Sequence, residues 1–517
     1  MPSSPLRQVA ALLPAFAAAA SLVLPMRLQA QQVEPSVQEQ LPEMGTAAES
    51  TLSIEDEYSI GRMVMRGLRE SGRVIEDPEL NEYIQGLGLR LSSQAQDGNR
   101  HFNFFVMNDP VINAFALPGG FIGIHSGLLM ETANESELAA VLAHEVSHVT
   151  QRHIARSIQN QGRASLVSTA AMLAAILIGA VAGGGSNATM GAMTAAQGLA
   201  AQNQINFTRE NESEADRVGI GIMAQAGFNP ESMPAFFETM GRRTQLGPDH
   251  MPELLRTHPV TSARIAESKA RAAQYPVIEP HDSFSYALMK ERLRVLTTPA
   301  GQDPRDYYAS TITNEPDASI AQVYGRALAQ IQGGDAAAAI PVLEHLRSDQ
   351  PQVMQFHTAL GQAQLAAGDV KGALDTLEKA RELAPRNVPV TVRYAEALMR
   401  ANRPKRAHEV LLDLFNNVPP SQEQIRQTAI AANAAGDVAD AYSYMAEYHL
   451  MSADLPLAIN QLELALSVPN LTDVQRQRFV ARLAELRQAL PKERQRLEKS
   501  DDRPQGDRPN ASTSLNW

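Results

Sequence analysis

The sequence contains no cysteine among its 517 residues. That absence excludes a disulfide framework, a thiol nucleophile and a lipid anchor attached to cysteine. Aromatic residues are also scarce, at 5% with a single tryptophan, but hydrophobic residues make up 44% of the chain. This length and hydrophobic content predict several folded domains and exclude global disorder.

The chain has fewer basic than acidic residues. The chain has 45 lysines and arginines against 57 acidic residues, and its formal net charge is −12. Nucleic-acid binding depends on basic surfaces that neutralise phosphates, and the sequence has no basic stripe. We therefore expect no nucleic-acid partner.

Residues 1–30 have the composition of a secretory signal peptide. Arg7 supplies the positive start, the stretch from Val9 to Leu24 is uncharged and apolar, and Leu28-Gln29-Ala30 offers a cleavage site. The alternative is an uncleaved membrane anchor, which the prolines and the short apolar stretch disfavour. For a secreted bacterial protein without cysteine, we expect the periplasm of a Gram-negative cell, with association to a membrane left open.

The most informative pattern in the chain is His144-Glu145-Val146-Ser147-His148. On a helix, positions i and i+4 share one face, so His144 and His148 can bind a single metal ion. Glu145 is rotated by about 100° from His144, which lets its carboxylate take a proton from a water molecule beside the metal. Asn134 with Glu137 three residues later is typical of a helix start and places the pattern on a helix. Two incidental histidines on a structural helix are the alternative.

A catalytic zinc ion needs a third protein ligand. The acidic run that begins at Arg209 supplies Glu210, Glu212 and Glu214, which compete for this role on chemistry alone. Glu212 and Asp216 are an i, i+4 pair, so one can bind the metal while the other orients a histidine from behind. An acidic helix face exposed to solvent is the alternative.

Together these patterns resemble the gluzincin metalloproteases, which include the CAAX prenyl protease and the bacterial membrane protease HtpX. Two further segments match, NAFALPGGFI from residue 113 and THPVTSAR from residue 257. The resemblance covers about residues 50–285. It implies one zinc ion per chain, Glu212 as the third ligand and Asp216 as its supporting partner.

The resemblance also implies that His258 can bind zinc as a fourth ligand, which would hold the enzyme idle. On chemistry alone, His258 and Arg264 are candidate donors to the oxyanion of the transition state. Whether His258 inhibits or catalyses stays open. Arg264 trails the histidine as the arginine of the family motif does, and we expect it to support the ligands.

Asn113-Ala114-Phe115 is predicted to begin an exposed edge strand, because alternating segments flank it and Pro118-Gly119-Gly120 supplies a turn. An edge strand has free backbone groups that an extended peptide can pair with. We therefore expect substrate to bind along Asn113, Ala114 and Phe115. His153 is interpreted as a residue at a helix end.

Residues 164–201, between the two metal motifs, form an uncharged insertion rich in alanine and glycine. Its first 19 residues are just long enough to span a bilayer. A single crossing would place Glu212 and His144 on opposite sides of the membrane, so the insertion must return or stay on one side. We expect two helices that contact a membrane peripherally or cap the active site; a packed helical hairpin is the alternative.

A repeat begins after a predicted linker at 296–316. Turn residues recur 34 positions apart, and a small residue follows each of them by five positions: Gly334, Gly368, Asn402 and Gly436, with Ala339, Ala373, Ala407 and Ala441. This period is typical of tetratricopeptide repeats, which stack pairs of antiparallel helices into an α-solenoid. The array is predicted over 317–499, and 500–517 is predicted to be a disordered tail.

The predicted fold is mainly α: an α+β zincin-type metalloprotease domain with a small sheet at 31–295, followed by the α-solenoid. This order resembles the outer-membrane β-barrel assembly-enhancing proteases. The resemblance implies a periplasmic zinc endopeptidase of envelope quality control that degrades misfolded or stalled outer-membrane β-barrel proteins and assists their assembly. It also implies that the repeats dock onto the β-barrel assembly machinery. A chaperone or adaptor with a mostly latent metal site is the alternative function.

Overall fold

The computed structural model describes residues 52–96, 101–161, 208–244, 252–279, 282–313 and 317–489. Three predicted segments lie outside these residues: the signal peptide (1–30), the apolar insertion (164–201) and the C-terminal tail (500–517). Within the described ranges, no helix is both long and apolar enough to cross a membrane.

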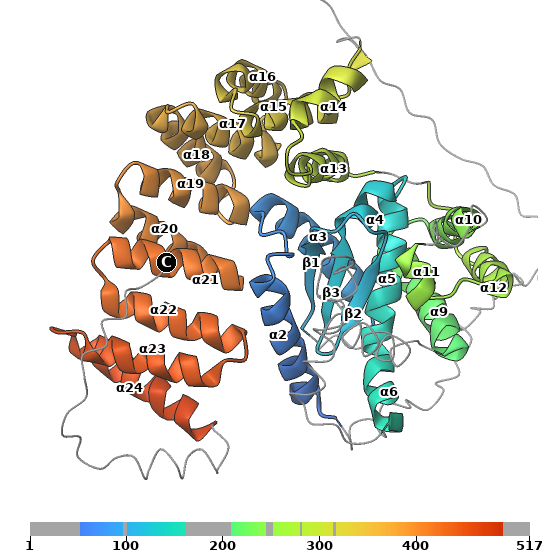
Figure 1. Cartoon of the computed structure of the whole chain (residues 1–517), viewed down its shortest axis with the longest axis horizontal. Helices are drawn as coiled ribbons and strands as arrows, with labels where there is room; N and C mark the ends of the chain where they lie inside the picture. Colours follow the sequence, from blue (N-terminus) through green and yellow to red (C-terminus); the bar gives the residue numbers. More distant parts are fainter. Residues whose placement is uncertain are drawn as a thin grey trace, which may run out of the picture. The chain divides into compact units, whose positions relative to one another are not determined.

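A three-stranded sheet lies in the N-terminal part of the chain (Figure 1). Its strands are β1 (Asn103–Met107), β2 (Ala114–Leu117) and β3 (Phe121–His125), in the order β1-β3-β2. β1 runs parallel to β3, whereas β2 is antiparallel to β3 and pairs Leu117 with Phe121. The turn between them passes through Gly119 and Gly120, whose φ angles of 79° and 84° favour glycine.

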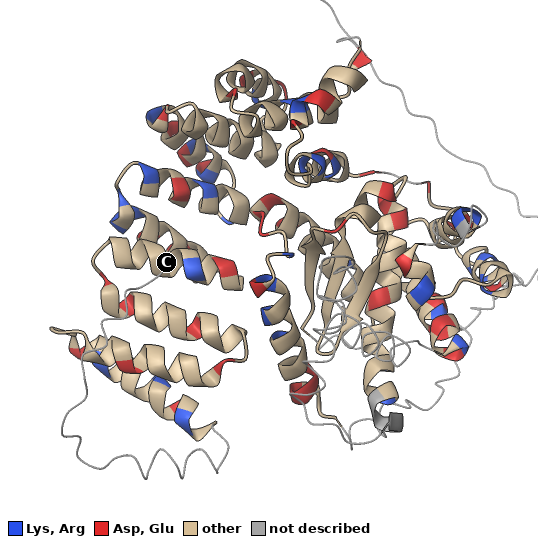
Figure 2. Ribbon diagram, viewed as in Figure 1, with Lys and Arg blue, Asp and Glu red and all other residues tan. Residues whose placement is uncertain are grey.

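Helices surround this sheet. They are α2 (Ile54–Glu70), α3 (Pro78–Ser92), α4 (Ser126–Glu131), α5 (Glu135–Thr150), α6 (His153–Gln161), α9 (Arg209–Gln225), α10 (Ser232–Thr244), α11 (Glu253–Thr257), α12 (Ser262–Ala272) and α13 (Phe284–Leu296). α3 packs on β1, α5 packs on β2, and α9 packs on α5 (Figure 1). Lysine, arginine, aspartate and glutamate residues lie on the helices and in the loops, and the three strands contain none of them (Figure 2).

The core of the N-terminal part is built around α5. This helix is buried along nearly its whole length, and Leu138, Leu142 and Val146 are 0% exposed. They pack with Ile122 and Ile124 of β3, which are likewise 0% exposed. Replacing one such leucine with alanine lowers the free energy of unfolding by about 2–5 kcal/mol. The histidines of α5 therefore lie on a tightly packed, rigid helix.

The C-terminal part is an array of stacked helices that confirms the predicted repeat and the mainly α fold class (Figure 1). Its helices are α15 (Ile320–Gln332), α16 (Ala336–Asp349), α17 (Met354–Ala366), α18 (Val370–Leu383), α19 (Val388–Arg400), α20 (Pro404–Phe415), α21 (Gln422–Ala434), α22 (Val438–Met451), α23 (Leu455–Ser467) and α24 (Asp473–Gln488). The predicted turn residues all have positive φ, and the alanines that follow them are at most 1% exposed. Small residues therefore stand where paired helices come closest.

One helix falls inside the predicted linker at 296–316. α14 (Pro304–Thr311) begins at the cap residue Asp303 and packs on α15. Tyr308 of α14 is 1% exposed and donates a hydrogen bond of 2.8 Å to Glu291. This segment therefore carries structure of its own that its turn-rich composition did not predict.

A buried cluster of ion pairs connects the N-terminal part to the array. Arg292 of α13 binds Asp77 at 2.7 Å and Glu79 at 2.9 Å. Arg393 of α19 binds the same two carboxylates, at 3.2 and 2.9 Å. Burial by itself would raise the pKa of Glu79, but Arg292 and then Arg393 outweigh it and lower the pKa to about 2.

We expect the replacement Glu79→Gln to lower the free energy of unfolding by about 3 kcal/mol, because it leaves two buried guanidinium groups with one carboxylate. Urea unfolding at pH 7 measures this loss. Glu55→Gln is the matched control, since Glu55 is the second residue of helix α2 as Glu79 is of α3, but is exposed. Equal stability of the two variants would show that the cluster contributes nothing.

The same variant tests a pH dependence. Since the folded-state pKa of Glu79 lies below its ordinary value of 4.5, its stabilising contribution is complete above about pH 4.5 and is lost as the pH falls toward 2. Glu79→Gln should therefore flatten the fall in stability within this window, and Glu55→Gln should not. Unfolding free energies measured at several pH values between 2 and 5 check the difference.

Candidate metal site

The first half of the site lies on α5. Asn134 caps this helix by accepting a hydrogen bond of 2.9 Å from the backbone N–H of Glu137, as the sequence pattern predicted. His144 and His148 project from one face of the helix, and their Nε2 atoms are 3.0 Å apart. Both side chains are buried, at 5% and 1% exposure.

The second half lies on α9, which begins at the cap residue Thr208. Of the three competing glutamates, Glu212 faces the histidines: its carboxylate oxygens lie 3.5 Å from Nε2 of His144 and 3.5 Å from Nε2 of His148. Glu210 is exposed. Glu214 points away from this cluster, toward α6. Of the three glutamates, Glu212 is therefore the one that lies beside His144 and His148.

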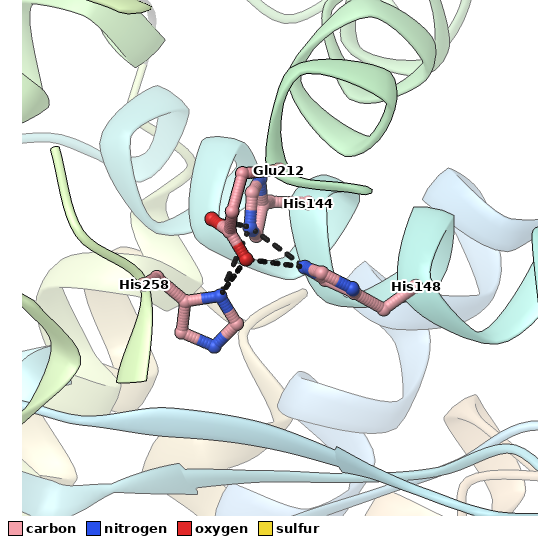
Figure 3. Close-up of side chains that lie close together, drawn as sticks. All are labelled: His144, His148, Glu212 and His258. Atoms are coloured by element: carbon pink, nitrogen blue, oxygen red, sulfur yellow. Dashed lines mark hydrogen bonds and ion pairs between the residues drawn. The ribbon is translucent and has the colours of Figure 1, made fainter. Parts of the chain in front are cut away.

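His258 completes the cluster (Figure 3). It stands at the C-terminal end of α11, and its Nδ1 lies 2.9 Å from Glu212 Oε1 and 3.4 Å from His144 Nε2. One ligand atom from each of the four residues His144, His148, Glu212 and His258 lies within 4.8 Å of the others, and all four residues are buried.

These spacings fit a tetrahedral metal ion. Zinc binds imidazole nitrogen and carboxylate oxygen at about 2.0–2.2 Å, which places neighbouring ligand atoms of a tetrahedron about 3.4 Å apart. Five distances between candidate donor atoms, counting both oxygens of Glu212, are 2.9 to 3.5 Å and lie close to that value. One ligand atom from each of the four residues lies within 4.8 Å of the others.

The charges of Glu212 and His148 suit metal binding, whereas His144 would have to lose a proton: burial alone would lower its pKa, but Asp216 and Glu212 outweigh it and raise the pKa to about 10. Burial alone would raise the pKa of Glu212, but His258 and His144 outweigh it and hold the pKa well below its usual range. Burial, and then the neighbouring His144, lower the pKa of His148 far below 6.5. A deprotonated carboxylate and a neutral imidazole are the forms that bind zinc.

Glu145 is 0% exposed and lies between the cluster and β2. Burial raises the pKa of its carboxyl group, while His258 and His144 act in the opposite direction. A carboxylate with a raised pKa can both accept and return a proton near neutral pH. His258 Nε2 lies 3.6 Å from Glu145 Oε1, so the base and the fourth donor are neighbours.

Asp216 and Arg264 contact members of the cluster, Asp216 at His144 and Arg264 at Glu212. Asp216 Oδ1 lies 2.9 Å from Nδ1 of His144. Arg264 donates two hydrogen bonds of 2.8 Å to Asp216, and its Nη1 lies 2.7 Å from Glu212 Oε2. Because the guanidinium group is 6% exposed and engaged with both carboxylates, Arg264 supports the ligands and is a poor donor to an oxyanion.

The sequence interpretation missed His153. This residue starts α6, as a helix-end residue would, but its side chain is 0% exposed and its Nδ1 lies 2.8 Å from Nδ1 of His148. The available signal was the presence of three histidines within ten residues in a chain that has only twelve.

The predicted substrate segment lies beside the site. β2 is at the edge of the sheet, and Ala114 and Phe115 belong to it. Asn113 precedes the strand, and its side-chain oxygen accepts a hydrogen bond of 3.0 Å from the backbone N–H of Ala114. The backbone of Ala116 is close enough to lower the pKa of Glu145. The edge strand and the candidate base are therefore adjacent.

Comparison with known proteins places these features in a family. The sequence model of Peptidase family M48 matches residues 78–272, and a tetratricopeptide repeat model matches residues 364–430. The β-barrel assembly-enhancing protease of Escherichia coli strain K12 is 34% identical over 452 residues, which are 87% of this chain and 91% of that protein.

Two other relatives match shorter stretches. A Vibrio cholerae relative is 41% identical over 317 residues, which are 60% of this chain and 64% of that protein. The mitochondrial metalloendopeptidase OMA1 of Arabidopsis thaliana is 34% identical over 189 residues, which are 36% of this chain and 35% of that protein. The match to the Escherichia coli protein spans both parts of the structure. The chain therefore belongs to the family of β-barrel assembly-enhancing proteases and is an M48 metalloprotease with a C-terminal tetratricopeptide repeat array.

Proposed function

We propose that this metalloprotease is a zinc endopeptidase whose single zinc ion is held by His144, His148 and Glu212. The observation that carries the proposal is the convergence of these three side chains, with His258, on one buried point. Two nitrogen donors and one carboxylate are a ligand set used by catalytic zinc, whereas calcium and magnesium ions prefer oxygen donors. Zinc bound there supplies a Lewis acid that activates water and polarises the scissile carbonyl group.

The side chains around that point have distinct tasks. Glu145 removes a proton from the attacking water and later delivers it to the leaving amine, which its burial and raised pKa favour. Asp216, whose Oδ1 lies 2.9 Å from Nδ1 of His144, fixes that ring and leaves its Nε2 to the metal. Arg264 pairs with both Asp216 and Glu212 and keeps them in place.

His258 holds the enzyme latent in this proposal. With His144, His148 and Glu212 it makes four protein donors, and a tetrahedral site with four protein ligands has no position for water. His258 follows the short helix α11, whose five residues form a small unit that can move without unfolding the helices that carry the other ligands. A bound substrate that displaced His258 would open the fourth position.

Substrate is proposed to bind as an added strand along β2, with Asn113, Ala114 and Phe115 at the entrance. Backbone pairing of this kind recognises an extended segment with weak dependence on its sequence. A small pocket next to His144 and His258 is lined by Val141, Phe237 and Leu254. Pairing along an edge strand suits unfolded segments better than folded proteins.

The proposed setting is the periplasm of a Gram-negative cell. The relatives' names describe enhancers of β-barrel assembly, and residues 1–30 have the composition of a signal peptide. We propose that the enzyme degrades misfolded or stalled outer-membrane β-barrel proteins and helps others to mature. Its repeat array would recruit the β-barrel assembly machinery, and residues 164–201 would contact a membrane peripherally or cap the site.

The ligand assignment predicts that purified wild-type protein contains one zinc ion per chain and that Glu212→Gln loses it, because an amide is a much weaker zinc ligand than a carboxylate. Glu210→Gln, a matched change on the same helix, should keep full zinc content. Metal analysis after gel filtration decides between them. Loss of zinc from Glu210→Gln together with retention by Glu212→Gln would contradict the assignment.

The latency proposal predicts that His258→Ala cleaves casein several times faster than wild type while retaining one zinc ion. Glu145→Gln, alone or combined with His258→Ala, should bind zinc and lose about 10²–10⁴ in rate, because only the base is missing. If His258 instead stabilises the oxyanion, His258→Ala would lose about 10²–10³ in rate. Envelope function that survives in the zinc-free Glu212→Gln variant would favour the chaperone or adaptor function.

Recruitment by the array predicts that residues 317–489, added in excess, compete with the full-length protein for outer-membrane assembly components in a pull-down from envelope extract. The groove formed by stacked helix pairs is the expected contact surface. Circular dichroism of the isolated array is the folding control. Undiminished recovery of these components in the presence of a folded competitor would exclude the array as the docking surface.

A further inference from the structure

Each histidine on α5 has a second ring nitrogen that faces away from the four-residue cluster. For His144 that nitrogen is Nδ1, and Asp216 lies 2.9 Å from it. For His148 it is also Nδ1, but its neighbour is another imidazole: Nδ1 of His153, at 2.8 Å. The two histidines are therefore supported in different ways, and the second support has no role in the mechanism described above.

The support of His148 continues beyond His153. On its far side, His153 Nε2 lies 3.1 Å from Oε2 of Glu214, and Arg156 Nη2 donates a hydrogen bond of 2.9 Å to the same oxygen. We propose that His153 is a positioning residue that fixes the ring orientation of His148 for metal binding, with Glu214 and Arg156 holding His153. This inference rests on the proposed metal site and assigns these three side chains a role in that site.

Donors and acceptors alternate consistently along the row His148, His153 and Glu214. A metal ion on Nε2 of His148 requires the ring proton on Nδ1, which then donates to the unprotonated Nδ1 of His153. His153 in turn carries its proton on Nε2 and donates to Glu214. Both rings stay neutral, and each polar atom in the row has a partner. A carboxylate that acts on a metal-binding histidine through one intervening group can still fix its tautomer.

The backbone is built to bring His153 to this position. If α5 continued without a break, residue 153 would lie about 140° around the helix axis from His148, facing away from its ring. Instead Arg152 adopts a φ of 54°, which redirects the chain between α5 and α6. Such a conformation is unfavourable for a residue with a side chain.

Buried contacts hold Arg152 in that conformation. Its Nε donates a hydrogen bond of 2.8 Å to Glu57 Oε1, and its Nη2 donates one of 2.6 Å to the backbone oxygen of Leu52. The arginine is 4% exposed, so both bonds are shielded from water. A strained and supported turn immediately before a fully buried histidine indicates that the position of His153 is specified by the fold.

The test measures zinc affinity in the full-length protein, by competition with a coloured chelator. His153→Ala should weaken zinc binding about 10–100-fold, the usual effect of removing a partner of a metal-binding histidine. Glu214→Gln, which keeps the side-chain volume, should weaken it in the same direction by a smaller factor. His153→Asn, whose amide can replace the contact made by Nδ1, should recover part of the loss.

Two controls separate positioning from plain packing. His357→Ala removes a buried histidine from the repeat array, and Glu210→Gln changes an exposed glutamate of α9. Both should bind zinc as wild type does. With the metal removed, His153→Ala should melt no lower than His357→Ala, and the rise in melting temperature on adding zinc should be smaller for His153→Ala. In the cobalt-substituted protein, the visible absorption bands of His153→Ala should differ from those of wild type.

Wild-type zinc affinity in both His153→Ala and Glu214→Gln would overturn the inference while leaving the proposed function intact. A wild-type protein that binds no zinc would instead overturn the proposed function. Should His153→Ala fail to fold, Glu214→Gln decides alone, because it removes the charge that holds His153 without creating a cavity. An affinity for Glu214→Gln equal to that of Glu210→Gln would then count against the inference.

Discussion

The close packing of α9 against α5 is the contact on which the metal site depends. A Cβ atom at Gly219 would lie 3.3 Å from the backbone of Ala143, so glycine lets the two helices approach at the residue before His144. Glu212 and Asp216 lie seven and three residues before Gly219 and share its helix face. The close contact of α9 with α5 therefore places both carboxylates beside the histidines. Metal ligands must be placed within a few tenths of an ångström, and a looser contact between these helices would separate the two halves of the site.

Packing two charged helices so closely requires compensation within the site. Unpaired buried carboxylates cost several kcal/mol each, and Glu212 and Asp216 are 1% and 3% exposed. Arg264 binds both of them, so its single positive charge offsets part of their two negative charges. The ligands are thus largely in place before a metal ion arrives, which reduces the entropy lost on binding. Glu214 is compensated in the same way, because Arg156 donates a hydrogen bond to its carboxylate.

The sequence predicts those parts of this structure that are fixed by local spacing. The pair His144 and His148, the cap at Asn134 and the 34-residue period of the array all depend on residues a few positions apart or on a regular repeat. The choice of Glu212 over its neighbours needed either the family resemblance or the contact with α5, because all three glutamates have similar local chemistry. The contact between His153 and His148 is only hinted at by the three nearby histidines, because it depends on the turn at Arg152, which Glu57 holds from 95 residues away. The ion-pair cluster around Asp77 could not be predicted from local spacing either, because Arg292 lies 215 residues further along the chain.

That cluster limits how the repeat array can serve the enzyme. Arg393 of α19 binds Asp77 and Glu79 at the start of α3, and Arg66 of α2 binds Asp454 at 2.6 Å. Helices α2 and α3 therefore occupy part of the surface that the array would offer to a partner. Since α3 also packs on α5, these ion pairs connect the array to the helix that carries the histidines.

A partner that took over the buried pairs would have to replace their charges, because breaking one buried pair costs about 3–5 kcal/mol. A partner that binds elsewhere on the array leaves the pairs intact and is held at a fixed position relative to the metal site. The second arrangement costs no buried charge, and for this reason it is the one we favour for the partner recruitment proposed for the array.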